Sequence, residues 1–206
     1  MREKALYLIG VLAVVLMAYN LAEIAAQPSE ALFYIPLAGV AGLAAVTALV
    51  AGIAFLRTRN FQFDALAVAA TEVGLAFLAA GIVCGCFLTH AEGGRWWSWD
   101  ARLTAALVCW LLYATYLMLR HAVQEPSQRA AFAAVWSVFA FLDVPLVVAT
   151  IAWWKPAAGM RMDWTPSRLL NLLALAMVGT LLTVVRMRQE EARRELDSLR
   201  RVTHAI

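Results

Sequence analysis

Long apolar stretches alternate with short polar segments along the chain of 206 residues. Each long stretch holds 18 or more mostly apolar residues, enough for a helix to cross the hydrocarbon core of a bilayer. None shows the two-residue alternation of a membrane β-strand, and lipid requires backbone groups to be satisfied within each helix. The pattern predicts six transmembrane helices, at Leu6–Ala26, Phe33–Leu56, Ala65–Leu88, Ala101–Leu119, Ala130–Trp154 and Arg168–Val185.

The composition supports an all-α integral membrane protein with short loops. Apolar residues make up 63% of the chain and charged residues 15%, and the mean hydropathy is +0.72. A soluble domain is usually about half apolar and about a quarter charged. The net charge of +3 is small and the basic residues are dispersed, so we expect no nucleic-acid partner. No nucleophile–base pair or metal-ligand spacing is evident, so we do not expect an enzyme.

The start of the chain, Met1 to Lys4 before an apolar run, is similar to a secretory signal. The run of about 20 residues is nevertheless long enough to span a bilayer, so we expect it to be the first membrane helix.

Basic residues predict the orientation, because cytoplasmic loops carry more of them. Twelve lie on one predicted side: Arg2, Lys4, Arg57, Arg59, Arg120, Arg129, Arg186, Arg188, Arg193, Arg194, Arg200 and Arg201. Five lie on the other: Arg95, Arg102, Lys155, Arg161 and Arg168. Both termini are therefore expected on the cytoplasmic side, with the loop after the third span facing outward, into a periplasm or its equivalent.

The last span continues into a polar segment, Arg186–Val202, that we expect to be helical. Glu190/Arg194 and Asp197/Arg201 are oppositely charged pairs four residues apart, and a thin apolar stripe runs beside them. This tail is either a solvated helix near the inner membrane surface or a docking face for a partner subunit. The expected organisation is a six-helix membrane domain over residues 1–188, with an outer loop at 94–104, and a cytoplasmic tail over residues 189–206.

Two carboxylates lie well inside the apolar runs, and all three cysteines also fall within these runs. Glu72 requires a partner or water at its depth, and a hydrogen bond to a neighbouring helix would satisfy it. Asp143 precedes Pro145, which frees a carbonyl and kinks a helix, so local hydrogen bonding is expected there. Cys84 and Cys86 lie on different faces of a helix, and with Cys109 they are expected as small packing residues; a redox pair that includes Cys109 is the alternative.

Three tryptophans crowd four positions of the outer loop, at Trp96, Trp97 and Trp99. Membrane anchoring uses aromatic residues at both interfaces, yet the tryptophans gather on this side, where Trp153 and Trp154 also fall. A dense group of indoles with cations beside it suits a large flat aromatic ligand that carries carboxylates. Haem is the ligand we expect.

The neighbours of these tryptophans have two readings each. Arg95 and Arg102 suit bidentate binding of haem propionates, although Arg102 can instead pair with Asp100 or extend to lipid headgroups. Asp100 is placed to cap the fourth helix, which also orders the loop. The tryptophans themselves contact either porphyrin or the membrane interface.

Residues 94–104 (Gly-Arg-Trp-Trp-Ser-Trp-Asp-Ala-Arg-Leu-Thr) resemble the WWD signature of the cytochrome c biogenesis haem-handling proteins, of the haem exporter protein C (CcmC) type. Residues 34–36 (Tyr-Ile-Pro) stand where that family has His-Val-Pro. Residues 143–148 (Asp-Val-Pro-Leu-Val-Val) resemble its Asn-x-Pro-x-x-His segment, with the Trp-Trp pair after it. The likeness extends over about residues 33–188.

The resemblance implies transient binding of b-type haem at the periplasmic face, with ATP-binding-cassette transporter subunits and a periplasmic haem chaperone as partners. The family's two axial histidines correspond here to Tyr34 and Val148. A tyrosine phenolate is a known haem ligand, whereas valine cannot ligate iron. His90 is either a substitute ligand or an exposed histidine. The loss of both histidines leaves a second reading open, a structural or assembly subunit that does not ligate haem.

Overall fold

The computed structural model describes residues 10–12, 15, 18, 31–153 and 166–204. Every regular element within these residues is an α-helix, which confirms the predicted all-helical class. The elements are α2 (Ala31–Thr58), α3 (Phe61–Gly93), α4 (Ala101–Ala122), α5 (Pro126–Phe141), α6 (Asp143–Trp153) and α7 (Pro166–His204). The predicted first span, Leu6–Ala26, lies almost wholly outside the described residues.

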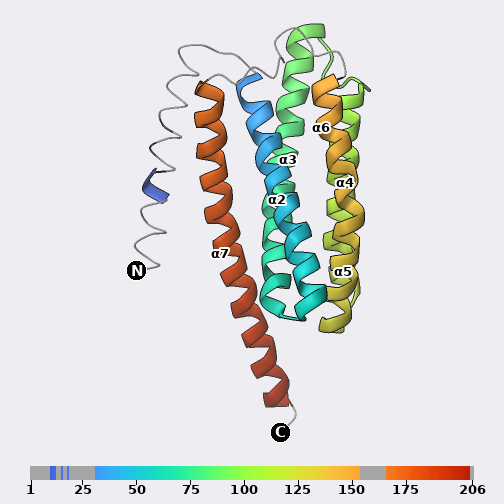
Figure 1. The fold of residues 1–206 in the computed structure, drawn as a ribbon, viewed down its shortest axis with the longest axis vertical. Coiled ribbons are helices and arrows are strands. Elements are labelled where there is room, and N and C mark those ends of the chain that lie inside the picture. The colour runs from blue at the N-terminus through green and yellow to red at the C-terminus, as the bar shows by residue number, and fades with distance from the viewer. Residues whose placement is uncertain (1–9, 13–14, 16–17, 19–30, 154–165, 205–206) are drawn as a thin grey trace.

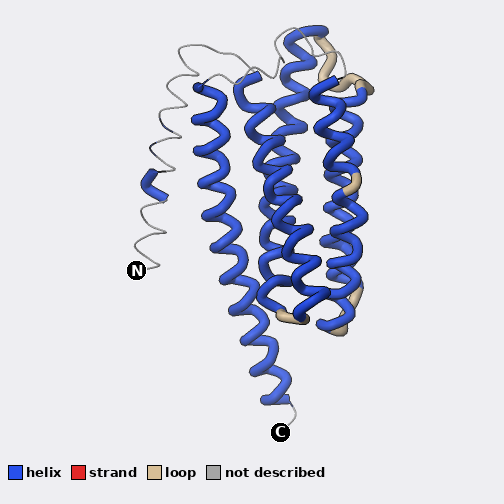
Figure 2. The backbone as a smooth tube through the Cα atoms, in the orientation of Figure 1, coloured by secondary structure: helices blue, strands red, loops and turns tan. Residues whose placement is uncertain are grey.

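Five segments of the described chain are long and apolar enough to cross a membrane. They are Ile35–Thr58, Phe61–Ala91, Ala101–Ala122, Pro126–Thr150 and Leu169–Leu196. These segments correspond to the second to sixth predicted spans. They stand side by side in one bundle with successive segments antiparallel (Figure 1), and the described loops between segments lie at its two ends (Figure 2).

The distribution of side chains is that of a protein in lipid. Large apolar side chains such as Val50 and Met118 are 60% and 69% exposed on the outside of the bundle. The interior is rich in alanine, and glycine lets helices approach closely. A Cβ on Gly74 of α3 would lie 2.8 Å from the Cβ of Ala44 in α2. Small residues at helix contacts are typical of membrane proteins, where apolar surface alone does not drive helices together.

The fifth predicted span is two helices, which corrects the expectation of one continuous helix over Ala130–Trp154. α5 ends at Phe141 and α6 begins at Asp143. Pro145 has no N–H to donate to the carbonyl of Phe141, and its ring crowds that carbonyl. The N–H of Leu142 instead bonds to the carbonyl of Phe139 at 3.1 Å. Beyond this break α6 packs against α4, whereas α5 packs against both α2 and α4.

Asp64 of α3 connects three helices at the end of the bundle where α2 joins α3. Arg120 of α4 donates to both of its carboxylate oxygens, at 2.5 and 3.0 Å, and Arg194 of α7 donates to one of them at 2.7 Å. Arg194 also donates to the carbonyl of Phe61 at 2.8 Å. Asp64 and Arg120 are both buried. We call this the ion-pair end of the bundle.

Glu72, one of the two carboxylates found inside an apolar run, has the interhelical partner that its depth requires. Arg186 of α7 donates its Nε to a Glu72 carboxylate oxygen at 2.6 Å. The partner is thus a cation on the last span. Together with Asp64, this pair fixes α7 against α3.

α7 is one unbroken helix of 39 residues, and the predicted boundary between residues 188 and 189 falls inside it. Figure 1 shows that its C-terminal part continues past the ion-pair end along the same direction. The predicted Glu190–Arg194 pair is present at 3.4 Å. The side chains of Asp197 and Arg201 lie outside the described part of the chain. Leu196, on the predicted apolar stripe, is 58% exposed.

Candidate functional site

Residues 94–100, which we call the WWD loop, join α3 to α4 at the other end of the bundle, the loop end. Gly94 has a φ of 68°, a left-handed conformation that favours glycine, and its N–H bonds to the His90 carbonyl at 2.8 Å. Asp100 accepts from the Leu103 N–H and from the Ser98 hydroxyl, each at 2.8 Å. The prediction that Asp100 caps the fourth helix, α4, is confirmed, and the loop is fixed at both ends.

The tryptophans of the WWD loop belong to two aromatic groups, one that joins Trp96 to His90 and Phe87 and one that joins Trp97 to Trp99. Trp96 stacks on His90 with ring centroids 4.1 Å apart and an interplanar angle of 7°. Trp97 and Trp99 meet edge to face at 5.6 Å. Trp96 is 56% exposed and Trp99 is 80% exposed. The indoles therefore present two open aromatic surfaces at the loop end rather than one common plane.

Polar groups lie beside these surfaces. The indole Nε1 of Trp97 is buried and has no hydrogen-bond partner among the described residues, so a donor is left unused there. Arg95 is exposed. Arg102 is buried and lies 3.6 Å from an Asp100 oxygen. This pairing is the alternative to propionate binding that the sequence left open for Arg102. Arg95 is thus the better placed of the two arginines to meet an arriving carboxylate.

His90 belongs to the last turn of α3, although it lies beyond the predicted end of the third span and was therefore expected in a loop. The helix was expected to end at Leu88, but its hydrogen bonding continues until Gly94 reverses the chain. His90 is exposed, and one face of its ring lies against Trp96. The imidazole is therefore part of the aromatic surface itself.

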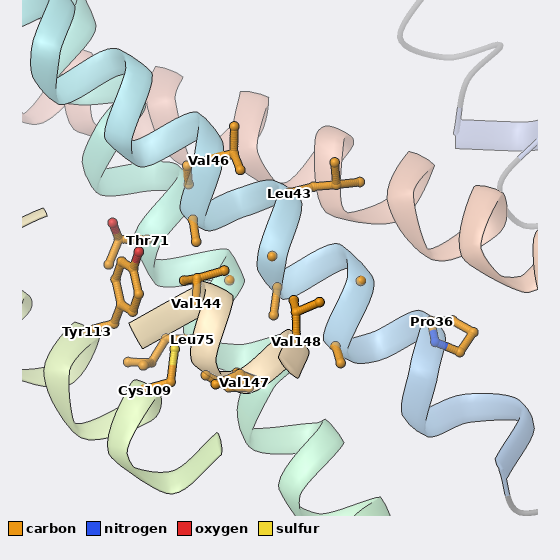
Figure 3. Close-up of a pocket in the computed structure, with 18 of the residues that line it drawn as sticks. Pro36, Leu43, Val46, Thr71, Leu75, Cys109, Tyr113, Val144, Val147 and Val148 are labelled. Carbon is orange, nitrogen blue, oxygen red and sulfur yellow. The ribbon is translucent and has the colours of Figure 1, made fainter. Parts of the chain in front are cut away.

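A pocket of about 350 Å³ lies deeper in the bundle, between α2, α3, α4 and α6 (Figure 3). Ile35 at the start of α2 and Val148 of α6 both line it. Tyr34 is adjacent to Ile35, in the first turn of α2. Tyr34 and Val148, which the sequence resemblance matched to the axial histidines, are therefore carried by helices that border the same pocket. Residues 94–100, all of which are described, do not line it.

The remaining predicted tryptophans are less fully placed. Trp153 is the last residue of α6, at the loop end of the bundle. Trp154 lies outside the described residues. Their contact with a ligand at the WWD loop therefore stays a prediction.

Two pocket residues, Cys109 and Tyr113 of α4, were not identified as site residues from the sequence. Cys109 was assigned to packing, and Tyr113 was not considered. Cys109 is free, as are the other two cysteines, and its thiol lies within hydrogen-bonding reach of Asp143. The buried residues of α4 recur every three or four positions, so this spacing already placed both side chains on its inward face. No cluster of three or more metal-ligating side chains occurs in the described part of the chain.

The fold and the loop define a helical, multi-pass membrane protein with a tryptophan-rich connection at one end. The family model described as Heme exporter protein C matches residues 3–204. The chain therefore belongs to the haem exporter protein C (CcmC) family.

Similar proteins carry names from the same area of biology. The chain is 34% identical over 161 residues to the Heme exporter protein C of Bradyrhizobium diazoefficiens, covering 73% of this chain and 61% of the relative. It is 37% identical over 78 residues to the Cytochrome c biogenesis protein CcsA of Prochlorococcus marinus, covering 38% of this chain and 24% of the relative. For CcsA of Synechococcus sp. (strain WH7803) the identity is 39% over 77 residues, covering 37% and 24%. The chain thus spans about three-fifths of the first relative's length and about a quarter of the other two.

Proposed function

We propose that this chain holds haem as a transient cargo at the periplasmic face of the bacterial inner membrane during cytochrome c maturation. The observation that carries the proposal is the WWD loop, which keeps exposed indoles in fixed positions in a member of the haem exporter protein C family. The names of the relatives, haem exporter and cytochrome c biogenesis protein, support the same cargo.

The loop has the chemistry that a porphyrin requires. The faces of Trp96 and Trp99 offer apolar area to the macrocycle, and burial of such area contributes about 25 cal/mol per Å². The exposed Arg95 is a donor for the propionates, and a charge-assisted arginine–carboxylate contact is among the stronger hydrogen bonds. Because Asp100 already orders the loop, less conformational entropy is lost on binding.

Iron ligation in this chain differs from the pair of histidines that the family resemblance implies. Val148 has no donor atom. Tyr34 and His90 remain as candidate ligands, a phenolate and an imidazole. We propose that macrocycle and propionate contacts dominate the binding and that at most one protein ligand reaches the iron. Weak ligation suits a cargo that must be passed on.

The orientation and the partners are part of the proposal. Arg57, Arg59 and Arg120 lie at the ion-pair end with the projecting part of α7, and by the positive-inside rule this distribution supports a cytoplasmic location for that end. The WWD loop then faces the periplasm, where a haem chaperone would receive the cargo. Subunits of an ATP-binding-cassette transporter are the expected membrane partners.

A second function, a structural or assembly subunit without haem, is favoured by one observation. Val148 stands at a position of the family's axial histidine and lines an apolar pocket. In this alternative the exposed indoles of the WWD loop would contact another protein. The two functions differ in whether haem binds to the loop at all.

Haem titration of the purified full-length chain in mild detergent separates these functions. We expect a saturable change in the Soret band and an affinity about tenfold weaker in a Trp96→Ala/Trp99→Ala variant, since each aromatic contact contributes about 0.5–1.5 kcal/mol. Phe132→Ala, a matched loss of an aromatic ring that is 54% exposed on α5, should bind as the parent does. Equal, unsaturable uptake by all three proteins would reject haem binding by the loop and leave the assembly subunit. Tyr34→Phe and His90→Ala identify the iron ligand by their ferric spectra.

A further inference from the structure

The pocket between α2, α3, α4 and α6 opens sideways towards lipid. α6 packs against α4 and α5 rather than against α2. α2 and α6 therefore border a gap on the C-terminal side of the Leu142 break. Leu43 of α2 and Val148 of α6 line the pocket and are 55% and 51% exposed on the lipid-facing surface. Figure 3 shows Tyr113 and Thr71 together at one end of the pocket and Pro36 at the other. A volume of about 350 Å³ falls in the range of small-molecule sites.

The lining selects an uncharged ligand. Among the described residues that line the pocket, the polar side chains are Thr71, Cys109 and Tyr113, and no carboxylate, ammonium or guanidinium group is present. A charge moved from water into such a site is strongly disfavoured unless it is paired. Haem carries two propionates and therefore does not suit the deep end of this pocket.

The Tyr113 hydroxyl supplies an unused donor at that deep end. Tyr113 is 5% exposed, and its hydroxyl has no partner among the described residues. The neighbouring Thr71 hydroxyl already donates to the Ala67 carbonyl at 2.8 Å. A buried donor without an acceptor is unfavourable, so a ligand oxygen that accepts from Tyr113 would bind well there.

The depth of Tyr113 restricts the source of that oxygen. It follows Ala101, the first residue of α4, by 12 positions, or about 18 Å along the helix. This lies past the middle of a hydrocarbon core about 30 Å thick. The ester carbonyls of phospholipids stay near the headgroups and do not reach it. A ring carbonyl on a hydrocarbon tail moves through the bilayer interior and does.

We propose that this pocket binds a quinone-type membrane molecule, a neutral ring with carbonyl oxygens and a hydrocarbon tail. The ring enters from the bilayer between α2 and α6, and one carbonyl accepts a hydrogen bond from the Tyr113 hydroxyl. Gly42 leaves room for the ring in the wall, because a Cβ at that position would meet no atom of the described residues within 4 Å. Residues 94–100 do not line the pocket, so this proposal does not depend on haem binding by the WWD loop.

Binding of decylubiquinone to the full-length chain in phosphatidylcholine nanodiscs tests the proposal. We expect saturable binding that Gly42→Phe abolishes, because Gly42 lines the pocket and a ring added there takes up the space of the ligand. Val50→Phe, on the lipid-facing side of the same helix, should bind as the parent does. Haem titration of Gly42→Phe should match the parent, which keeps the two proposals distinguishable. Unsaturable partition of the quinone, or unchanged binding by Gly42→Phe, would overturn the proposal.

The hydrogen bond is tested by a matched pair of variants. Tyr113→Phe removes only the hydroxyl and should weaken binding about fivefold. Tyr116→Phe removes another buried hydroxyl, one turn further along α4 and outside the pocket, and should leave the affinity for decylubiquinone unchanged. Decylbenzene, which has the tail and a ring but no carbonyl, should compete poorly. Equal competition by decylbenzene, or equal affinity in Tyr113→Phe, would reject carbonyl recognition.

Discussion

The two ends of the bundle are held together in different ways. At the ion-pair end, the polar contacts join residues far apart in the sequence: Arg120 and Asp64 are separated by 56 positions, Arg186 and Glu72 by 114 and Arg194 and Asp64 by 130. At the loop end, the hydrogen bonds of Asp100 reach residues two and three positions away. The first kind of contact fixes helices to one another, and the second fixes only the loop itself.

This difference separates stability from binding. Long-range ion pairs hold α3, α4 and α7 in place without help from the loop. The WWD loop is ordered locally, so its indoles do not have to fill the space between helices and can stay exposed. The bundle can therefore keep an aromatic surface open at one end because the other end carries the interhelical charge contacts.

The largest expected effect follows from removing the shared carboxylate of the ion-pair end. Asp64→Asn leaves the buried Arg120 without a counter-charge and should cost about 3–5 kcal/mol of unfolding free energy. Denaturant unfolding of the chain in detergent micelles measures the loss. Haem affinity per folded molecule should stay unchanged, since the WWD loop does not depend on this contact.

Glu72→Gln is the matched control at the same end. Arg186 is 36% exposed and also donates to Gln189 at 3.0 Å, so it keeps a partner in this variant and the cost should be smaller than that of Asp64→Asn. A loss as large as that of Asp64→Asn, or a loss of haem affinity in either variant, would contradict the separation of the two ends.

The next effect concerns the anchor of the WWD loop. Asp100→Ala removes the acceptor for the Leu103 N–H and should cost about 1 kcal/mol. Asp100→Asn keeps an acceptor of similar capping strength but removes the charge near Arg102. Haem affinity should fall in the alanine variant and be retained in the asparagine variant. Equal losses of haem affinity in the two variants would show that binding depends on the charge of Asp100 rather than on its cap.

The smallest effect is a titration at the start of α5. The Gln128 and Ser127 N–H groups and the Ser127 hydroxyl donate to Glu125, which holds the pKa of its carboxyl below the usual 4.5. Because the folded-state pKa is lowered, the cap stabilises α5 at pH values above 4.5. This stabilisation is lost as the pH falls through the folded-state pKa. The NMR shift of the Gln128 amide should titrate with a midpoint below 4.5, and Glu125→Gln should abolish the titration. A midpoint at or above that value would contradict the cap.

The sequence predicted the second to sixth spans well, because apolar length is a strong signal in a membrane protein. The cap at Asp100 was predicted because a capping contact is local and follows from residue type and spacing. The break at Leu142 was foreseen only as a kink at Pro145, since a missing N–H shows where a helix weakens and not how its two halves then pack.

The contacts between distant helices could not be read from the sequence. Asp64 stands near a predicted helix end, where a carboxylate is normally solvated, and nothing local points to Arg120 or Arg194 as its partners. The pocket also depends on the divergence of α6 from α2, which is a tertiary property. The face-to-face stacking of His90 on Trp96 requires α3 to continue past Leu88, and apolar length alone did not predict that turn.

Hydrogen–deuterium exchange with and without haem tests the central claim most directly, because it reports both ends of the bundle at once. The account predicts that haem slows amide exchange across residues 94–104 and leaves the ion-pair end, at residues 58–64 and 120–128, unchanged. Protection confined to the ion-pair end, or no haem-dependent protection at the WWD loop, would contradict it.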